Sequence, residues 1–142
     1  MLALRYARHW RMASIILLLI VLIAALMPAA IWFWSDDAPV VKWMTHIDKW
    51  LHGVTFVVLT VWFAGLYARH SYWLIALGLL LFGMLIELLQ GLVRYRMAEW
   101  YDLGADAIGI VVGLAIALAG LGGWCLKFEA WREQRAGQND NG

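Results

Sequence analysis

The stretch from Tyr72 to Val93 reads YWLIALGLLLFGMLIELLQGLV, and Glu87 is its only acidic or basic residue. About 20 apolar residues in a helix rising 1.5 Å per residue cross the roughly 30 Å hydrocarbon core of a bilayer. The stretch lacks the period-two alternation of a barrel strand, and it is too long for one. It therefore predicts a transmembrane helix with a carboxylate inside it.

Three further apolar runs flank this stretch. Together the four runs predict helices at about residues 12–34, 50–68, 72–93 and 103–126. Composition agrees, since 64% of the 142 residues are hydrophobic and 15% are charged, against about 45–50% and about 25% in soluble proteins. We expect one all-α integral membrane domain over residues 1–142, a four-transmembrane-helix bundle, with a disordered tail at about 134–142.

The first run could instead be a cleaved secretory signal, because arginines precede it. A signal's apolar region is only about 7–15 residues long, however. Ser14–Trp34 is longer and contains no charge. We therefore expect this run to remain in the protein as a membrane helix.

Lysine and arginine in short loops predict the orientation, because they are enriched on the cytoplasmic side. With the N-terminus inside, seven of them lie inside and four outside. The seven are Arg5, Arg8, Arg11, Arg69, Lys127, Arg132 and Arg135, and the four are Lys42, Lys49, Arg94 and Arg96. This asymmetry predicts that both termini are cytoplasmic.

Two whole-chain properties exclude classes of partner and site. The formal net charge is +1, so no basic field exists to attract nucleic acid, and none is expected as a partner. Cys125 is the single cysteine. An intrachain disulfide and a cysteine-based metal site are therefore excluded.

Polar residues gather at three helix ends that this topology places on the outer side. The second and fourth helices begin there, and the third ends there. Within each helix these residues are spaced by three or four and so share one face. The candidate ligand-binding residues are Asp48, Lys49, His52, Glu87, Gln90, Arg94, Arg96, Asp102 and Asp106.

Glu87 is the most informative of these residues. It lies about 9 Å below the end of its helix at 1.5 Å per residue. A charged side chain inside the membrane costs roughly 2.5–3.5 kcal/mol on insertion scales. We therefore expect Glu87 to face the interior, within reach of Lys49, His52, Arg94 or Arg96.

The stripe that begins with Asp102 and Asp106 continues as Gly109, Gly113 and Ala117. This small-xxx-small spacing predicts that another helix approaches the fourth one closely.

These motifs resemble the VanZ-like family. That family's pattern reads approximately DKxxH, then ExxQ, then R, then D-x-x-x-N-x-x-G-x-x-x-G. Its counterparts over about residues 48–113 are Asp48-Lys49-x-x-His52, Glu87-x-x-Gln90, Arg96, Asp102, Asp106, Gly109 and Gly113, with Asp106 in place of the usual Asn.

The resemblance implies a small multi-pass protein of the bacterial cytoplasmic (inner) membrane. The founding member of the family gives low-level resistance to the glycopeptide teicoplanin. The resemblance implies no settled chemical activity, and it leaves the oligomeric state open.

The leading functional hypothesis is recognition of membrane lipids, namely an anionic envelope lipid or a lipid-linked cell-wall precursor. Lys49, Arg94 and Arg96 supply cations suited to phosphate, and arginine can bind it through two parallel hydrogen bonds. The carboxylates would hold these cations in place and keep the empty site near neutral.

Several alternatives stay open. A membrane-embedded hydrolase or transferase acting on a lipid phosphate would use His52, Asp48 and Glu87 as catalytic candidates, although no nucleophile motif is present. A structural knot of polar groups would only hold the helices together. The carboxylates and His52 would suit a divalent ion, but the three nearby cations oppose one, so no metal or cofactor is expected. A transporter is disfavoured, because four helices show no inverted repeat.

Overall fold

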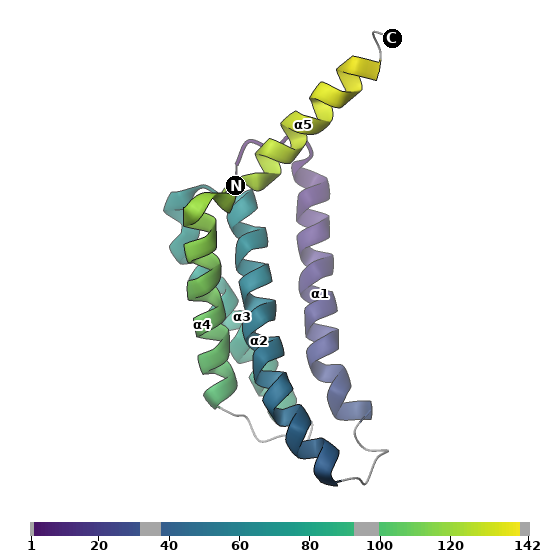
Figure 1. Cartoon of the computed structure of the whole chain (residues 1–142), viewed down its shortest axis with the longest axis vertical. Helices are drawn as coiled ribbons and strands as arrows, with labels where there is room; N and C mark the ends of the chain where they lie inside the picture. The colour runs from purple at the N-terminus through teal and green to yellow at the C-terminus, as the bar shows by residue number, and fades with distance from the viewer. Residues whose placement is uncertain (1, 32–37, 93–99, 140–142) are drawn as a thin grey trace.

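The computed structural model describes residues 2–31, 38–92 and 100–139, and it describes side chains within 2–26, 50–92 and 101–136. These residues form helices and no strand (Figure 1), which confirms the all-α prediction. The long helices are α1 (Ala7–Ile31), α2 (Ala38–Leu66), α3 (Tyr72–Leu92), α4 (Trp100–Ile116) and α5 (Trp124–Asn139). Two short helical turns, η2 (Arg69–Ser71) and η3 (Ala117–Leu121), lie between them.

Three helical stretches are long and apolar enough to cross a membrane, namely Ala7–Leu26, Arg69–Leu92 and Tyr101–Leu121. The part of α2 with described side chains, Trp50–Leu66, is also apolar but shorter. Many large apolar side chains on α1, α2, α3 and α4 face outward, and a surface so widely apolar suits lipid better than water. These features indicate a helical membrane protein.

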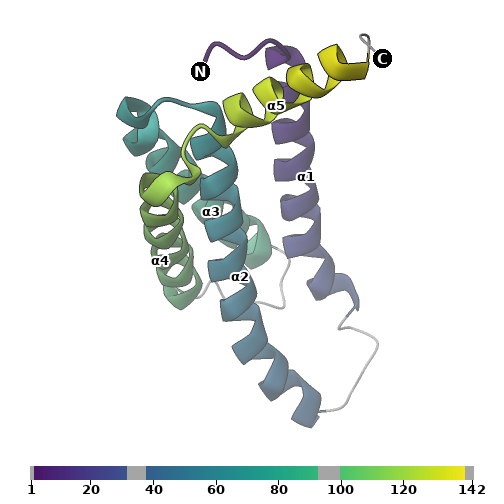
Figure 2. The same cartoon turned by 45° about the horizontal axis from the view of Figure 1, so that its top comes forward.

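Helices α2, α3 and α4 form the packed centre of the bundle, with α4 lying mainly against α2. Helix α1 runs beside them, and α5 crosses the end of the bundle where both chain termini lie (Figures 1 and 2). The buried core contains Phe56 and Leu59 from α2, Leu79 and Ile86 from α3, and Ile110 from α4. Helices α2, α3 and α4 therefore enclose the buried interior of the bundle.

Glycines line the contact between α2 and α4. A Cβ atom on Gly109 would overlap the backbone of Gly53, and one on Gly113 would meet the side chain of Thr60. Any larger residue at these positions would push the helices apart. The small-xxx-small prediction for α4 is therefore confirmed.

Helix α2 begins at Ala38, although the sequence predicts a start near residue 50. The prediction stopped at polar residues, but residues 40–52 contain neither proline nor glycine to interrupt a helix. Pro39 stands in the first turn, where its missing N–H costs no hydrogen bond.

The last predicted span, about 103–126, is interrupted by glycines. Gly120 and Gly123 have φ angles of 143° and 69°, a backbone conformation that favours glycine. The N–H of Gly123 donates to the carbonyl oxygen of Ala64 at the end of α2 (3.0 Å). The chain therefore turns here, and α5 is a separate helix.

Helix α5 continues to Asn139, so the predicted disorder from about residue 134 is wrong up to that residue. Arg5 pairs with Glu133 at 2.9 Å, and the guanidinium of Arg135 lies 4.4 Å from the ring centroid of Trp131. Contacts with the N-terminal segment and within α5 thus order a polar stretch whose composition alone suggests a tail.

Glu129 fastens α5 to the start of α1. Its carboxylate accepts hydrogen bonds from the backbone N–H of Arg5 (3.0 Å), the backbone N–H of Tyr6 (3.2 Å) and the indole N–H of Trp10 (2.8 Å). The first amides of a helix have no partner within the helix. A carboxylate near them also interacts favourably with the helix dipole.

Replacing Gly109 by alanine should destabilise the bundle by about 1–3 kcal/mol, the usual cost of overpacking. Gly104→Ala is the matched control on the same helix, because a Cβ there meets nothing within 4 Å. That change should be neutral or slightly stabilising, since alanine favours a helix more than glycine does. Thermal unfolding in detergent followed by circular dichroism measures both, and equal melting would contradict the close α2–α4 contact.

Acid should weaken the docking of α5 on α1. Burial alone would raise the pKa of Glu129, but the hydrogen bonds from Trp10, Arg5 and Tyr6 outweigh it, so the pKa lies below the ordinary 4.5. A depressed folded-state pKa gives stability that is present above 4.5 and lost as the pH falls through the folded value.

Hydrogen exchange at the amides of Arg5 and Tyr6, corrected for intrinsic rates, should show protection at about pH 6 that declines as the pH falls below 4.5 and through the folded-state pKa of Glu129. Glu129→Gln cannot ionise, so protection in this variant should be weaker and independent of pH. Equal protection of these amides in the unchanged protein and in Glu129→Gln at about pH 6 would exclude Glu129 as the group that holds α5 to α1.

Candidate functional site

Five of the nine candidate ligand-binding residues have described side chains, and all five are buried: His52, Glu87, Gln90, Asp102 and Asp106. They come from α2, the last turns of α3 and the first turns of α4, at the end of the bundle opposite α5. The other four lie outside the described side chains: Asp48, Lys49, Arg94 and Arg96.

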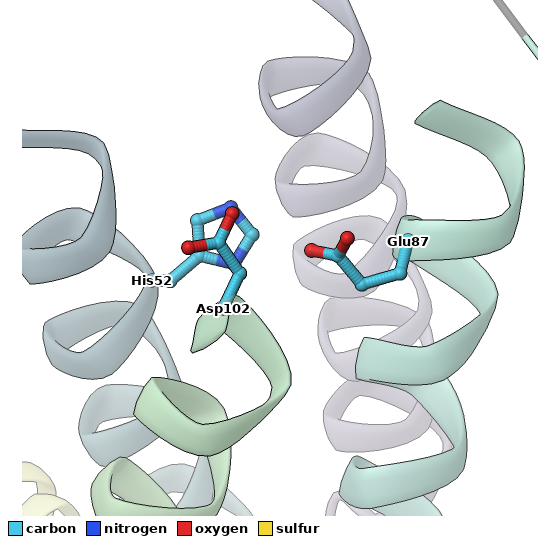
Figure 3. A group of neighbouring side chains, drawn as sticks. All are labelled: His52, Glu87 and Asp102. Atoms are coloured by element: carbon cyan, nitrogen blue, oxygen red, sulfur yellow. The ribbon is translucent and has the colours of Figure 1, made fainter. Parts of the chain in front are cut away.

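Three of these side chains meet between the helices. Glu87 of α3 points toward His52 of α2 and Asp102 of α4 (Figure 3). One nitrogen or oxygen atom from each lies within 4.8 Å of the other two. Packing thus brings together groups that stand up to fifty residues apart in the sequence, and Glu87 faces the interior as expected.

The local pattern of each helix explains these directions. On α3 the buried residues Leu79, Gly83, Ile86, Glu87 and Gln90 follow steps of three and four or are neighbours, so they form one face. On α4, Asp102 lies in the first turn. The unpaired amides and the helix dipole there favour a negative charge.

His52 contacts a carboxylate on the facing helix that spacing within α2 could not indicate. Its Nδ1 lies 3.2 Å from Oδ1 of Asp106 on α4, and both residues are buried. The i, i+4 spacing along α2 also places Asp48 on the face of His52, but the side chain of Asp48 lies outside the described residues, so that pairing stays a prediction. Only the approach of α4 to α2 brings Asp106 to His52.

Gly83 is a site residue that sequence reasoning missed. A Cβ atom there would stand 2.5 Å from Oδ2 of Asp106 and 3.2 Å from the ring of Phe56. The missing side chain makes room for the Asp106 carboxylate against α3. The signal was present in the sequence, because Gly83 stands four residues before Glu87 and thus on its face.

Gln90 is buried at the edge of the site and binds α1 rather than the three-residue group. Its Nε2 donates to the backbone carbonyl oxygen of Ala25 at 2.9 Å. This bond ties α1 to α3 close to Glu87. Gln90 therefore connects the edge of the site to α1.

The described part of the site is acidic, with three carboxylates and one imidazole. The lysine and arginine side chains that the structure describes stand at the opposite end, in the segment before α1 and its first turns, in η2 and in α5. Carboxylates next to an imidazole can exchange a proton, hold a cation or position a basic group. His52, Glu87 and Asp102 are the described residues that could hold a metal ion.

The fold and the site together define a helical membrane protein with a buried carboxylate–histidine cluster at one end of its bundle. No protein-family model, curated protein or solved structure matches the chain.

Proposed function

We propose that the chain is a VanZ-like protein of the bacterial cytoplasmic membrane. It crosses the membrane four times, with both termini in the cytoplasm. At its outer face it recognises the anionic polar part of an envelope lipid or of a lipid-linked glycan.

The observation that carries this proposal is the convergence of His52, Glu87 and Asp102, each buried and each from a different helix. Ionisable groups at membrane depth are costly, and they commonly mark pathways and binding sites. A site at a helix end can also admit the polar head of a lipid whose tails stay in the bilayer.

Basic residues in the adjoining segments complete the proposed site. Lys49 precedes His52 by three positions, and Arg94 and Arg96 follow the end of α3. Arginine binds phosphate with a planar pair of donors. The buried carboxylates would orient these cations toward a phosphate at the membrane surface.

A second candidate is a hydrolase or transferase acting on a lipid phosphate. The contact between His52 and Asp106 favours it, because a buried carboxylate fixes the orientation of an imidazole that can then accept a proton. Release of inorganic phosphate from a lipid phosphate, abolished by His52→Gln while the lipid still binds, would establish this candidate.

Reporter fusions should place Gly142 in the cytoplasm and the segment near Pro39 outside. The physical reason is the charge asymmetry, since lysine and arginine resist translocation. Alkaline phosphatase and green fluorescent protein, fused at each position in turn, give opposite readouts across the membrane. Equal readouts at the two positions would contradict four crossings.

Binding of a short-chain phosphatidylglycerol to the protein in neutral detergent should depend on the outer site. We expect Arg96→Ala and Glu87→Gln each to weaken binding tenfold or more, about 1.4 kcal/mol. Added salt should also weaken it, because charge attraction contributes. Isothermal titration calorimetry measures the affinity.

The matched controls are Arg69→Ala, which removes an arginine at the opposite end, and Glu133→Gln, which removes an exposed carboxylate. Both should change the affinity less than twofold. Equal weakening by all four changes, with equal loss of thermal stability, would show that the cluster is a structural knot.

A further inference from the structure

The buried cluster has the composition of a metal site. Glu87 and Asp102 supply carboxylate oxygens, and His52 supplies an imidazole nitrogen. Imidazole and carboxylate are the ligands that Zn²⁺ and Mn²⁺ accept in proteins. Zinc sites that bind substrate commonly use three such protein ligands and keep one position open.

The separation of the donor atoms suits one ion. They lie within 4.8 Å of one another, whereas ligands at about 2.0–2.2 Å from tetrahedral zinc stand about 3.3–3.6 Å apart. Small rotations of the Glu87 and Asp102 carboxylates would close this difference. Figure 3 shows that Glu87 extends toward the other two residues from the facing helix.

A further carboxylate stands where a metal-binding histidine needs one. Asp106 Oδ1 lies 3.2 Å from Nδ1 of His52, which leaves Nε2 as the nitrogen for a metal. Metal-binding histidines commonly donate their other N–H to a carboxylate, which fixes the ring and raises its basicity.

The burial of Asp106 is a separate observation that also points to a ligand. Asp106 is 0% exposed, and among the described residues its Oδ2 is buried with no hydrogen-bond partner. A buried carboxylate is costly unless its charge is paired and hydrogen-bonded, and Asp106 contacts His52 through Oδ1. Such burial is expected where a nearby cation compensates the charge.

We propose that His52, Glu87 and Asp102 bind a single divalent ion, Zn²⁺ or Mn²⁺, and that Asp106 orients His52 for it. A position left open on the ion would accept a phosphate oxygen of the lipid. That last step alone rests on the proposed function, and metal binding itself does not. The proposal departs from the sequence expectation of no metal, which relied on the three cations of the adjoining segments.

Metal binding is tested on the full chain in detergent, stripped with a chelator and titrated with ZnCl₂ or MnCl₂ against an indicator dye. The unchanged protein should bind about one ion per chain. Glu87→Gln, Asp102→Asn and His52→Gln should each weaken binding at least tenfold, since each removes a ligand. Asp106→Asn should weaken it about 10–100-fold, as expected for a residue that acts through the histidine.

Glu133→Gln is the matched control, because it makes the same change as Glu87→Gln on an exposed carboxylate, and it should leave the affinity unchanged. X-ray absorption of the zinc-loaded, unchanged protein adds a readout that does not depend on how the variants fold. One imidazole and oxygen ligands would support the site. A sulfur ligand, or two or more imidazoles, would overturn it.

The proposal is also overturned if the unchanged protein binds no more Zn²⁺ or Mn²⁺ than the variant that lacks all three ligands. Titrating the metal-free protein with phosphatidylglycerol separates this failure from failure of the proposed function. If the protein binds no metal but still binds the lipid in a way that depends on Arg96, the metal site is excluded and lipid recognition is retained. If the protein binds one ion at the cluster but no lipid, the metal site is supported and lipid recognition is excluded.

Discussion

Helices α2 and α4 approach so closely that a methyl group at Gly109 would overlap the backbone of Gly53. In a bilayer, lipid tails are as apolar as the side chains, so association depends on packing and hydrogen bonding more than on the hydrophobic effect. The glycine-lined contact provides that packing. It also sets the distance at which His52 meets Asp106, and the buried cluster therefore depends on it.

The same contact explains why three helices have to be assembled before the cluster exists. Glu87 on α3 faces His52 and Asp102 only because α3 packs beside both α2 and α4. A carboxylate left in hydrocarbon would be costly. Enclosing His52, Glu87 and Asp102 between three helices removes these groups from lipid.

The two ends of the bundle differ in construction. At one end, Glu129 and the ring of Trp10 fasten α5 across the start of α1, where described arginines also gather. At the other end, carboxylates and one histidine are buried between helices. At the end next to α5, the Glu129 carboxylate accepts hydrogen bonds from the amides before α1. At the opposite end, the negative charge of the buried carboxylates has to be neutralised by a proton, a basic side chain or a metal ion.

The sequence by itself determined the helical class and the apolar stretches, because hydropathy depends on composition and a helix satisfies its own backbone in lipid. It also determined the glycine stripe of α4 and the inward direction of Glu87, since both follow from spacing along one helix. It failed where structure depends on contacts between distant segments. The docking of helix α5 is one case, because Glu129 and Glu133 contact the distant Arg5.

The tertiary structure alone decided which polar groups meet. Packing brings Asp106 of α4 to His52 of α2, a contact that spacing along α2 could not indicate. Spacing places Gly83 on the face of Glu87, but the role of Gly83 depends on Asp106, which occupies the space beside it from another helix. Periodicity fixes the face on which a side chain lies, but the partner opposite that face depends on how helices pack.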